Sequence, residues 1–346
     1  LCPSCGSEML ISGPEPACQN CRKAFSFSEG VLDLSGGESY WDMVPKEHME
    51  DLLAKIPELG WQKAIQSSQF PEIRDNYLWA DAPSRTDGSY YLPLTKESTV
   101  LDLGSGWGSY TFPLSMRTKL VVAADSCDGS LRLISLRAGQ DGINNIIPVH
   151  IRPIDLGPLP FRSGTFDCVI MNGVLEWVGS YAKKGDPKAF QERALKEAFR
   201  ILRPGGRLFI GIENRFGYSY FLGAPDDHLN HYSKGKKVSY TTLMPRFMAN
   251  IISKRKLGVP YRTYTHSICG LGRMIKKAGF SGAEYYYPEK GYRALSTKII
   301  PFKSSDISSS MTKRYGKHLL FNVSSKLLGA GFFCDSCFAI ASKEGQ

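Results

Sequence analysis

Apolar and polar positions in the larger, C-terminal part of the chain alternate between short β-rich runs and helical repeats. The runs that predict strands are Thr99–Leu103, Leu120–Asp125, Ile146–Ile151, Phe166–Met171, Arg207–Ile212, Ala283–Tyr287 and Phe332–Ala341. Helical patterns fill the gaps, most clearly Pro187–Leu202, which ends at a Pro-Gly-Gly turn. Strands that alternate with helices predict an α/β fold, a doubly wound, mostly parallel sheet of seven strands covered by helices.

The pattern also predicts domain boundaries. Residues 1–35 are punctuated by Cys, Gly and Pro, and residues 36–95 form an acidic and aromatic linker or cap region with a helix near Lys46–Ile56. In that helix Met49, Leu52, Leu53 and Ile56 follow the i, i+3, i+4, i+7 spacing of a buried face. Residues 96–346 form the main domain, with insertions near 215–265 and 301–328 that we expect to carry substrate-specific surface.

The net charge of +10 is unevenly spread along the chain. Residues 1–95 hold 7 basic and 14 acidic residues, a charge of −7, and the remainder holds 36 and 19, a charge of +17. A basic catalytic part favours an anionic partner, such as RNA, a phosphorylated or nucleotide-linked sugar, or a membrane surface, over a neutral one. A solvated basic surface without a partner would give the same count.

Four of the nine cysteines lie within the first 21 residues as Cys2-x2-Cys5 and Cys18-x2-Cys21. Two such pairs supply four thiolates from two turns, which suits a closed, tetrahedral structural Zn²⁺ site. Because so small a module cannot bury an adequate core, we predict a zinc ribbon held together by its metal. An odd cysteine count with clustered pairs indicates a reducing compartment rather than a disulfide framework.

No run approaches the roughly 18 apolar residues of a membrane span, and the first residues lack a signal-peptide pattern. We therefore expect a soluble, cytoplasmic protein. The pattern carries no information on its oligomeric state.

A glycine-rich loop follows the first predicted strand of the main domain, as Gly104-Ser105-Gly106-Trp107-Gly108. Glycines there allow the backbone to come close to a ligand. The spacing is G-x-G-x-G and not the G-x-G-x-x-G of dinucleotide sites. Asp125 ends the second strand, 21 positions after Gly104, where its carboxylate can accept hydrogen bonds from ribose hydroxyls.

Residues 98–217 closely resemble the class I methyltransferases that use S-adenosylmethionine (SAM), which have a Rossmann-like fold. The resemblance includes Leu159-Pro160-Phe161 with Gly164 and Phe166-Asp167, the segment Asn172–Trp177, and the turn Leu202-Arg203-Pro204-Gly205-Gly206. It implies SAM as cofactor, and it implies that Asp167 organises the backbone. Family members often place a histidine in the segment around Gly173 and Trp177, and this chain has none there.

The resemblance also implies which residues bind SAM. They are Gly104, Ser105 and Gly106 along the methionine, Asp102 at its amino group, Asp125 and Ser126 at the ribose, Asp155 and Leu156 at the adenine, and Asn172 beneath the sulfonium.

The acceptor side is expected directly after the fifth strand, at the carboxyl edge of the sheet where α/β proteins bind ligands. The segments Glu213-Asn214-Arg215-x-Gly217 and Gly223-Ala224-Pro225-x-Asp227-His228 resemble methyltransferases of bacterial surface-polysaccharide and glycan clusters. Transfer to a hydroxyl requires a base, and His228 is the preferred candidate, although it could instead cap a turn. Glu213 and Arg215 are expected to clamp a polar acceptor or to pair with each other.

The leading hypothesis is methylation, on oxygen, of a small molecule or glycan. The first alternative is an RNA base methyltransferase, because the ribbon and its spacing resemble the bacterial ribosomal RNA guanine-N1 methyltransferases and Lys254-Arg255-Lys256 suits phosphate contacts. The second alternative is a non-catalytic subunit with the SAM fold, against which the intact glycine loop and Asp125 count.

Overall fold

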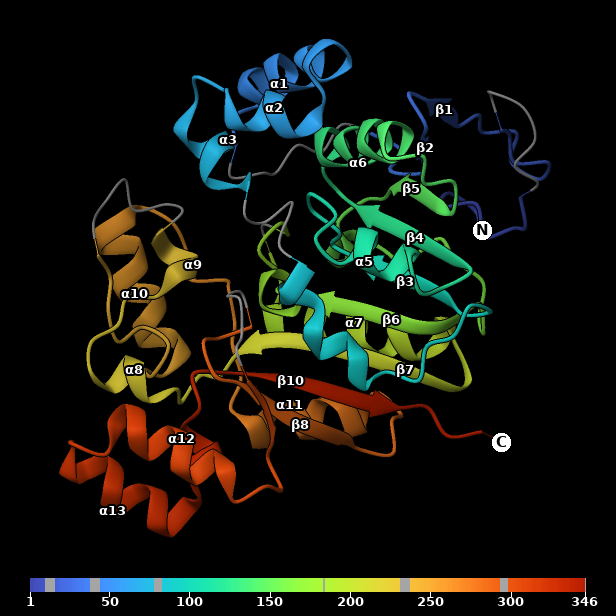
Figure 1. Ribbon diagram of the computed structural model, residues 1–346. Helices are drawn as coiled ribbons and strands as arrows, with labels where there is room; N and C mark the ends of the chain where they lie inside the picture. The colour runs from blue at the N-terminus through green and yellow to red at the C-terminus, as the bar shows by residue number, and fades with distance from the viewer. Residues whose placement is uncertain are drawn as a thin grey trace. The chain divides into compact units, whose positions relative to one another are not determined.

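The computed structural model describes residues 1–9, 16–37, 44–77, 83–182, 184–230, 237–292 and 298–345 (Figure 1). Residue contacts divide the chain into two compact units. The first contains Leu1–Met171, Arg200–Arg207 and Gly345–Gln346, and the second contains Asn172–Phe199 and Leu208–Glu344. Strand β7 (Leu202–Glu213) contributes its first six residues to the first unit and the rest to the second.

In the first unit the strands are ordered β1, β2, β5, β4, β3, β6 and the start of β7. Their bounds are β1 (Ser26–Ser28), β2 (Val31–Asp33), β3 (Thr99–Leu103), β4 (Leu120–Asp125), β5 (Ile146–His150) and β6 (Phe166–Asn172). The pairs from β2 to β6 are parallel, and β1 pairs antiparallel with β2. Because β3 lies between β4 and β6, Asp102 is opposite Ala123 on one side and Ile170 on the other.

In the second unit the order is β7, β10, β8, β9. The bounds are β8 (Ala283–Pro288), β9 (Ile299–Pro301) and β10 (Ser336–Ser342). Strand β8 runs antiparallel to both of its neighbours, with Tyr286 opposite Phe338 and Pro301.

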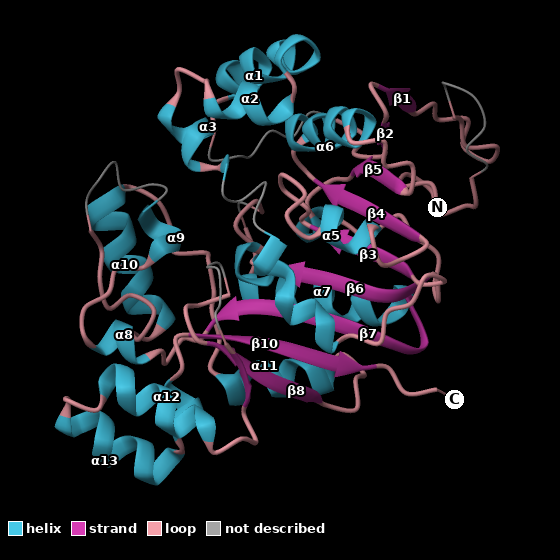
Figure 2. Cartoon of the chain, in the orientation of Figure 1, coloured by secondary structure: helices cyan, strands magenta, loops and turns pink. Residues whose placement is uncertain are grey.

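The α/β class and the mostly parallel sheet are confirmed, and each of the seven predicted strands is present (Figure 2). The number seven is wrong, because the sheet contains ten strands among the described residues. Strands β1, β2 and β9 have three residues each, too few to show a hydrophobic period. The last predicted strand starts later than expected, because Ala330–Phe333 forms the 3-10 turn η4.

The helices of the first unit include those of the 36–95 region. They are α1 (Lys46–Leu59), α2 (Trp61–Gln66), α3 (Pro71–Asp75), η1 (Pro83–Tyr91), α5 (Thr111–Ser115), α6 (Asp128–Gln140) and η2 (Ile154–Leu156). The predicted face of α1 is buried, and it shares a core with Trp107 and with Leu133 of α6. Helix α1 ends at Gly60, whose φ of 81° suits a residue without a side chain. Helices α1 and α2 therefore belong to the first unit and pack against α6.

The second unit supplies the remaining helices. They are η3 (Leu175–Trp177), α7 (Pro187–Ile201), α8 (Tyr218–Phe221), α9 (Asp227–Asn230), α10 (Arg246–Leu257), α11 (Ile268–Lys277), α12 (Asp306–Tyr315) and α13 (Leu319–Leu328). The two stretches expected as insertions thus contain α8 to α10 and α12 to α13. The first has its own small core of Leu229, Val238, Ala249 and Tyr261.

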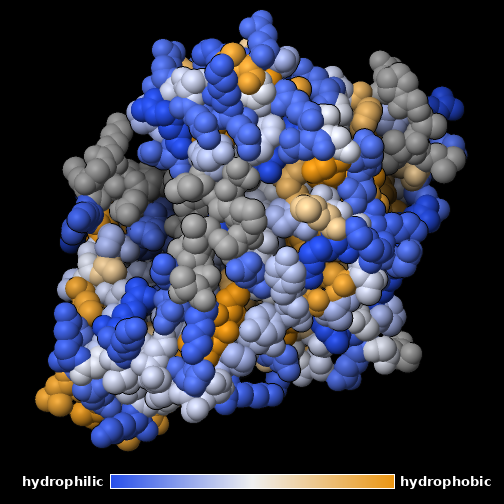
Figure 3. All heavy atoms as spheres, in the orientation of Figure 1, coloured by the Kyte–Doolittle hydropathy of each residue, from blue (hydrophilic) through white to orange (hydrophobic). Residues whose placement is uncertain are grey.

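No described helix is long and apolar enough to cross a membrane. Helix α13 nevertheless exposes apolar side chains (Figure 3). Among them, Leu319, Leu320 and Leu327 are each more than three-quarters exposed. Phe321 of the same helix is fully buried among aromatic rings that include Tyr218 and Phe333.

Candidate active site

The glycine loop connects β3 to α5 at the carboxyl end of the sheet in the first unit. Gly104, Gly106 and Gly108 have φ values of 74°, 50° and 83°, in the left-handed region that favours glycine. A side chain at Gly108 would collide with Phe112, whereas a Cβ at Gly106 would have no atom within 4 Å. The loop therefore presents main chain to open space at Gly106.

Asp125, at the end of β4, holds this loop in place. Its Oδ2 accepts a hydrogen bond from the Gly106 N–H at 2.8 Å, and its Oδ1 accepts one from the Cys127 N–H at 2.9 Å. The side chain predicted to bind ribose is thus fixed by backbone donors on both sides.

Two further polar groups lie beneath the loop. Asp102 is buried and accepts a hydrogen bond from the Thr111 hydroxyl at 2.6 Å. Burial raises the pKa of its carboxyl group to about 7. The buried Ser105 hydroxyl has no hydrogen-bond partner among the described residues. Since buried polar atoms are normally paired, this oxygen points to a missing polar ligand.

The remaining predicted SAM residues follow neighbouring strands. Asp155 is buried within η2, and the adjacent Leu156 is half exposed. Ser126 follows β4, and its carbonyl oxygen lies 3.3 Å from His150 Nε2. Asn172 ends β6 in the second unit, where Gly211 leaves room for its side chain.

Asp167 organises backbone, as expected. Its Oδ2 accepts from the Thr99 N–H at 2.7 Å, and its Oδ1 accepts from Arg203 at 3.0 Å. It thereby links the start of β3 to the turn that precedes the body of β7.

The four N-terminal cysteines converge in the first unit. The Sγ atoms of Cys2 and Cys21 are 3.6 Å apart, and so are those of Cys5 and Cys18. All four sulfur atoms lie within 4.8 Å of one another. Four thiolates at Zn–S distances of about 2.3 Å in a tetrahedron are separated by about 3.8 Å, so the donor set fits Zn²⁺.

A basic pocket of about 560 Å³ opens in the second unit. Its charged lining consists of Asp186, Lys188, Glu192, Arg215, Arg246, Arg273 and Lys277, beside Tyr264 and His266. Glu192 is neutralised by Lys277, whose ammonium lies at 2.6 Å. No described carboxylate lies within ion-pair distance of Arg215, Arg246 or Arg273.

Backbone carbonyls hold two of these guanidinium groups in position. Arg215 donates to the carbonyl oxygens of Thr242 and Met244, at 2.8 and 2.7 Å. Arg246 donates to the Thr265 carbonyl and stacks over the Tyr264 ring at 4.2 Å. The expected Arg215–Glu213 pair is not formed in this structure. Arg215 instead belongs to the pocket.

His266, in the same pocket, is uncharged at neutral pH. Burial, together with the neighbouring Arg246, lowers the pKa of its imidazole to about 3. Its Nε2 lies 2.7 Å from the side-chain oxygen of Gln191, and an Nε2–H donates there. The positive charge of the pocket thus comes from its arginines and lysines.

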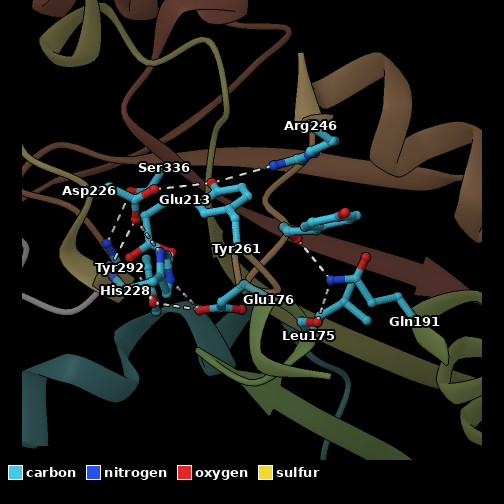
Figure 4. Close-up of polar contacts among 11 residues, drawn as sticks. Leu175, Glu176, Gln191, Glu213, Asp226, His228, Arg246, Tyr261, Tyr292 and Ser336 are labelled. Atoms are coloured by element: carbon cyan, nitrogen blue, oxygen red, sulfur yellow. Dashed lines mark hydrogen bonds and ion pairs between the residues drawn. The ribbon is translucent and has the colours of Figure 1, made fainter. Parts of the chain in front are cut away.

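His228 and Glu213 meet in a different place in the second unit, a buried cluster completed by Glu176 and Asp226 (Figure 4). His228 Nε2 lies 3.8 Å from Glu176 Oε1 and 3.5 Å from Glu213 Oε2. Its Nδ1 lies 3.2 Å from Asp226 Oδ1. His228 is fully buried, with its ring edge-on to Trp177 at 5.0 Å.

The carboxylates dominate the electrostatics of this cluster. Burial alone would lower the pKa of His228, but Glu213 and the bond to Asp226 raise it well above the usual value. Burial likewise raises the pKa of Glu176. The Tyr292 hydroxyl lies 3.0 Å from Glu176 and 3.1 Å from Glu213, and its single hydrogen can serve only one of them.

The predicted site residues therefore separate into groups. Asp102, Gly104, Ser105, Gly106 and Asp125 are together at one loop, Arg215 lines the basic pocket, and Glu213 and His228 share the buried cluster. That His228 is a base stays a prediction. Glu176 and Asp226 lie in the quoted segments Asn172–Trp177 and Gly223–His228, but the sequence analysis gave them no role. It also missed Tyr292 and Arg246, which no motif or spacing in the chain distinguishes.

Comparison with known proteins adds to this geometry. Residues 101–210 match the family model of a methyltransferase domain. The chain is similar to the ubiquinone/menaquinone biosynthesis C-methyltransferase UbiE of Salmonella paratyphi B, at 28% identity over 262 residues, which cover 73% of this chain and 92% of that protein.

Solved structures are also similar. One is a SAM-dependent methyltransferase, a possible histamine N-methyltransferase, of Thermotoga maritima, with 17% identity, a TM-score of 0.44, and coverage of 80% of this chain and 97% of that one. Another is phosphoethanolamine N-methyltransferase 2 of Haemonchus contortus in complex with S-adenosylhomocysteine, with 13% identity, a TM-score of 0.47, and coverage of 82% and 60%.

The matched domain begins within β3 and contains the glycine loop, Asp125 and the strands that carry them. The protein is an S-adenosylmethionine-dependent methyltransferase.

Proposed function

We propose that this methyltransferase modifies a small-molecule or glycan acceptor that carries an anionic group. The single observation that carries the proposal is the set of three guanidinium groups, on Arg215, Arg246 and Arg273, that line one pocket without a described carboxylate partner. Arginine binds phosphate and carboxylate through paired donors, so such a lining suits a phosphorylated, nucleotide-linked or carboxylated sugar.

For the cofactor, we propose that the open backbone at Gly106 and the Ser105 hydroxyl contact the methionine part of SAM. Asp102 would orient its amino group and Asp125 its ribose, with Ser126 beside it. Asp155 and Leu156 would contact the adenine, which would cover the exposed Leu156 side chain. Asn172 completes the proposed set near the sulfonium. SAM supplies the methyl group as an electrophile, and these residues hold it in position.

The acceptor atom is proposed to be an oxygen. A hydroxyl must lose its proton during transfer, and His228, with Glu213 beside it, is the proposed base. The likeness of the Glu213–Gly217 and Gly223–His228 segments to glycan-cluster methyltransferases supports this choice. The name of the UbiE relatives points instead to carbon methylation in quinone biosynthesis, but a lining of five basic side chains does not match an uncharged acceptor.

For the N-terminal segment, we propose a structural Zn²⁺ on Cys2, Cys5, Cys18 and Cys21. The equal sulfur–sulfur separations support tetrahedral coordination. With four protein ligands the ion has no open position, so its role is to stabilise the fold of this segment.

The acceptor proposal is tested by transfer of a radiolabelled methyl group from SAM to a panel of acceptors. The panel contains nucleotide-linked sugars, sugar phosphates, uronic acids, their neutral counterparts, a quinol and total RNA. We expect label in the anionic sugars alone. Labelling of the neutral sugars or the quinol at the same rate as the anionic sugars would overturn the proposal. Labelling of RNA alone would also overturn it, and would support the RNA alternative.

A further inference from the structure

From the buried cluster we infer a binding site for a divalent transition-metal cation, with Glu176, Glu213 and His228 as its ligands. This inference goes beyond the acceptor proposal and does not depend on it. The three residues come from η3, from the end of β7 and from α9, all within the second unit. One atom from each lies within 4.8 Å of the other two (Figure 4).

Asp226 determines which nitrogen of His228 is available. Asp226 Oδ2 accepts hydrogen bonds from the hydroxyls of Thr241 and Tyr261, both at 3.0 Å, and its Oδ1 accepts from the His228 main-chain N–H at 3.2 Å. A carboxylate so surrounded by donors is an acceptor for Nδ1–H as well. This carboxylate–histidine pair is the arrangement that orients metal-binding histidines and leaves Nε2 facing the ion.

The Nε2 atom faces carboxylates without a hydrogen bond to them. It is fully buried and has no hydrogen-bond partner among the described residues, and the same holds for Glu176 Oε2. A cation bound between Nε2 and the two glutamates would displace the proton from this nitrogen and pair with both carboxylates.

The distances distinguish a cation from a proton. A hydrogen bond from Nε2–H to a carboxylate spans about 2.7–3.2 Å, and the observed separations of 3.5 and 3.8 Å are longer. Ligands bound at about 2.1 Å to one tetrahedral ion are about 3.4 Å apart. The cluster therefore has the spacing of a coordination sphere.

Charge and donor type identify the class of ion. Three buried carboxylates, those of Glu176, Glu213 and Asp226, surround the imidazole of His228. A site of one nitrogen and two carboxylate oxygens is better suited to Zn²⁺, Mn²⁺ or Fe²⁺ than to an ion that prefers thiolate ligands. A bound ion would tie together three segments separated in the sequence. In the metal-loaded protein His228 would be a ligand and would not also accept a proton.

The test counts zinc in the full-length protein after saturation with Zn²⁺ and desalting, by elemental mass spectrometry. We expect two ions per chain in the wild type and one fewer in Glu176→Gln and in His228→Gln. Glu284→Gln, which changes an exposed carboxylate of β8, is the matched control and should retain the wild-type count. The test compares the zinc content of the wild type with that of the variants, which all contain the four cysteines. The result therefore does not depend on whether the cysteine site binds zinc. Equal zinc in the wild type and both variants would overturn the inference.

A second measurement covers the case in which these variants fail to fold. Mn²⁺ favours oxygen and nitrogen ligands over thiolates, so it reports on this site and not on the cysteines. We expect titration of wild-type protein to remove one equivalent of the free Mn²⁺ signal in electron paramagnetic resonance and to raise Tm by about 5 °C. An undiminished signal and an unchanged Tm in the wild type would then refute the site.

Discussion

The carboxylate of Asp125 accepts a hydrogen bond from the main-chain N–H of Gly106 across 2.8 Å, and so connects the end of β4 to the loop that follows β3. Strands β3 and β4 are parallel, so their carboxyl ends meet at one edge of the sheet. A ligand at this edge would be held by main chain on one side and by a charged acceptor on the other.

We predict that Asp125→Ala weakens SAM binding at least about 50-fold, because a hydrogen bond to a charged group is worth about 1.5–3 kcal/mol and the loop also loses its support. Isothermal titration calorimetry with SAM measures the change. Glu97→Ala, which removes an exposed carboxylate from the same unit, should bind like the wild type. Unchanged affinity in Asp125→Ala would remove this residue from the cofactor site.

The raised pKa of Asp102 predicts how stability changes with pH. In the unfolded chain this carboxyl group titrates near 3.8, whereas burial raises its pKa in the folded protein to about 7. Between these values the folded state holds one more proton than the unfolded state, so the Asp102 contribution to stability falls as pH rises from about 4 to 7. Above pH 7 this contribution no longer changes.

Asp102→Asn removes that titration. The difference in unfolding free energy between variant and wild type should therefore grow in favour of the variant from pH 4 to pH 7, by as much as about 4 kcal/mol. Urea unfolding at several pH values measures it. A difference that is independent of pH would show that Asp102 titrates normally.

The parts of the fold that were predictable have continuous patterns. The apolar runs around Val121 and Val169 predicted central strands, and the spacing from Met49 to Ile56 predicted one face of a helix, as the structure has them. The strands β1, β2 and β9 gave no such signal, because three residues are too few to show a hydrophobic period.

The residues of the candidate site also differ in whether they could be predicted from the sequence. The glycine loop is local, so its residues were identifiable from spacing. Tyr292 reaches Glu176 across 116 positions, and Tyr261 reaches Asp226 across 35, and no sequence period links such pairs. Single residues in long connections become a cluster only when the chain has folded around them.

The proposed cysteine site predicts the effect of metal removal. Cys21→Ser should lose one zinc ion per chain and lower the protection of residues 1–35 in hydrogen exchange, because this small segment depends on its metal. The parallel pairs β3–β4 and β3–β6 should keep their protection, since they have their own core. Zinc content equal to that of the wild type would contradict the assignment.

The basic pocket predicts how KM for the acceptor changes when one of the positive charges of the pocket is removed. Arg273→Gln should raise KM for an anionic acceptor at least about 10-fold while kcat changes much less, because a charged hydrogen bond that serves binding is lost. Lys313→Gln, an exposed cation on α12 outside the pocket, is the control. An Arg273→Gln variant with unaltered KM would show that the acceptor does not contact this pocket.

The proposed role of His228 as a base predicts separate effects of its replacement on SAM affinity and on turnover. His228→Gln should keep SAM affinity within about twofold, since the residues proposed to bind SAM do not include it, and should lower turnover at least about 100-fold, the usual contribution of a catalytic base. Full activity would exclude His228 as the base. If His228 binds a cation, chelation of wild-type protein should lower turnover by a similar factor, and added Mn²⁺ should restore it in the wild type but not in His228→Gln. If His228 is instead the base, chelation should leave wild-type turnover unchanged, because no bound ion is then needed to remove the acceptor proton.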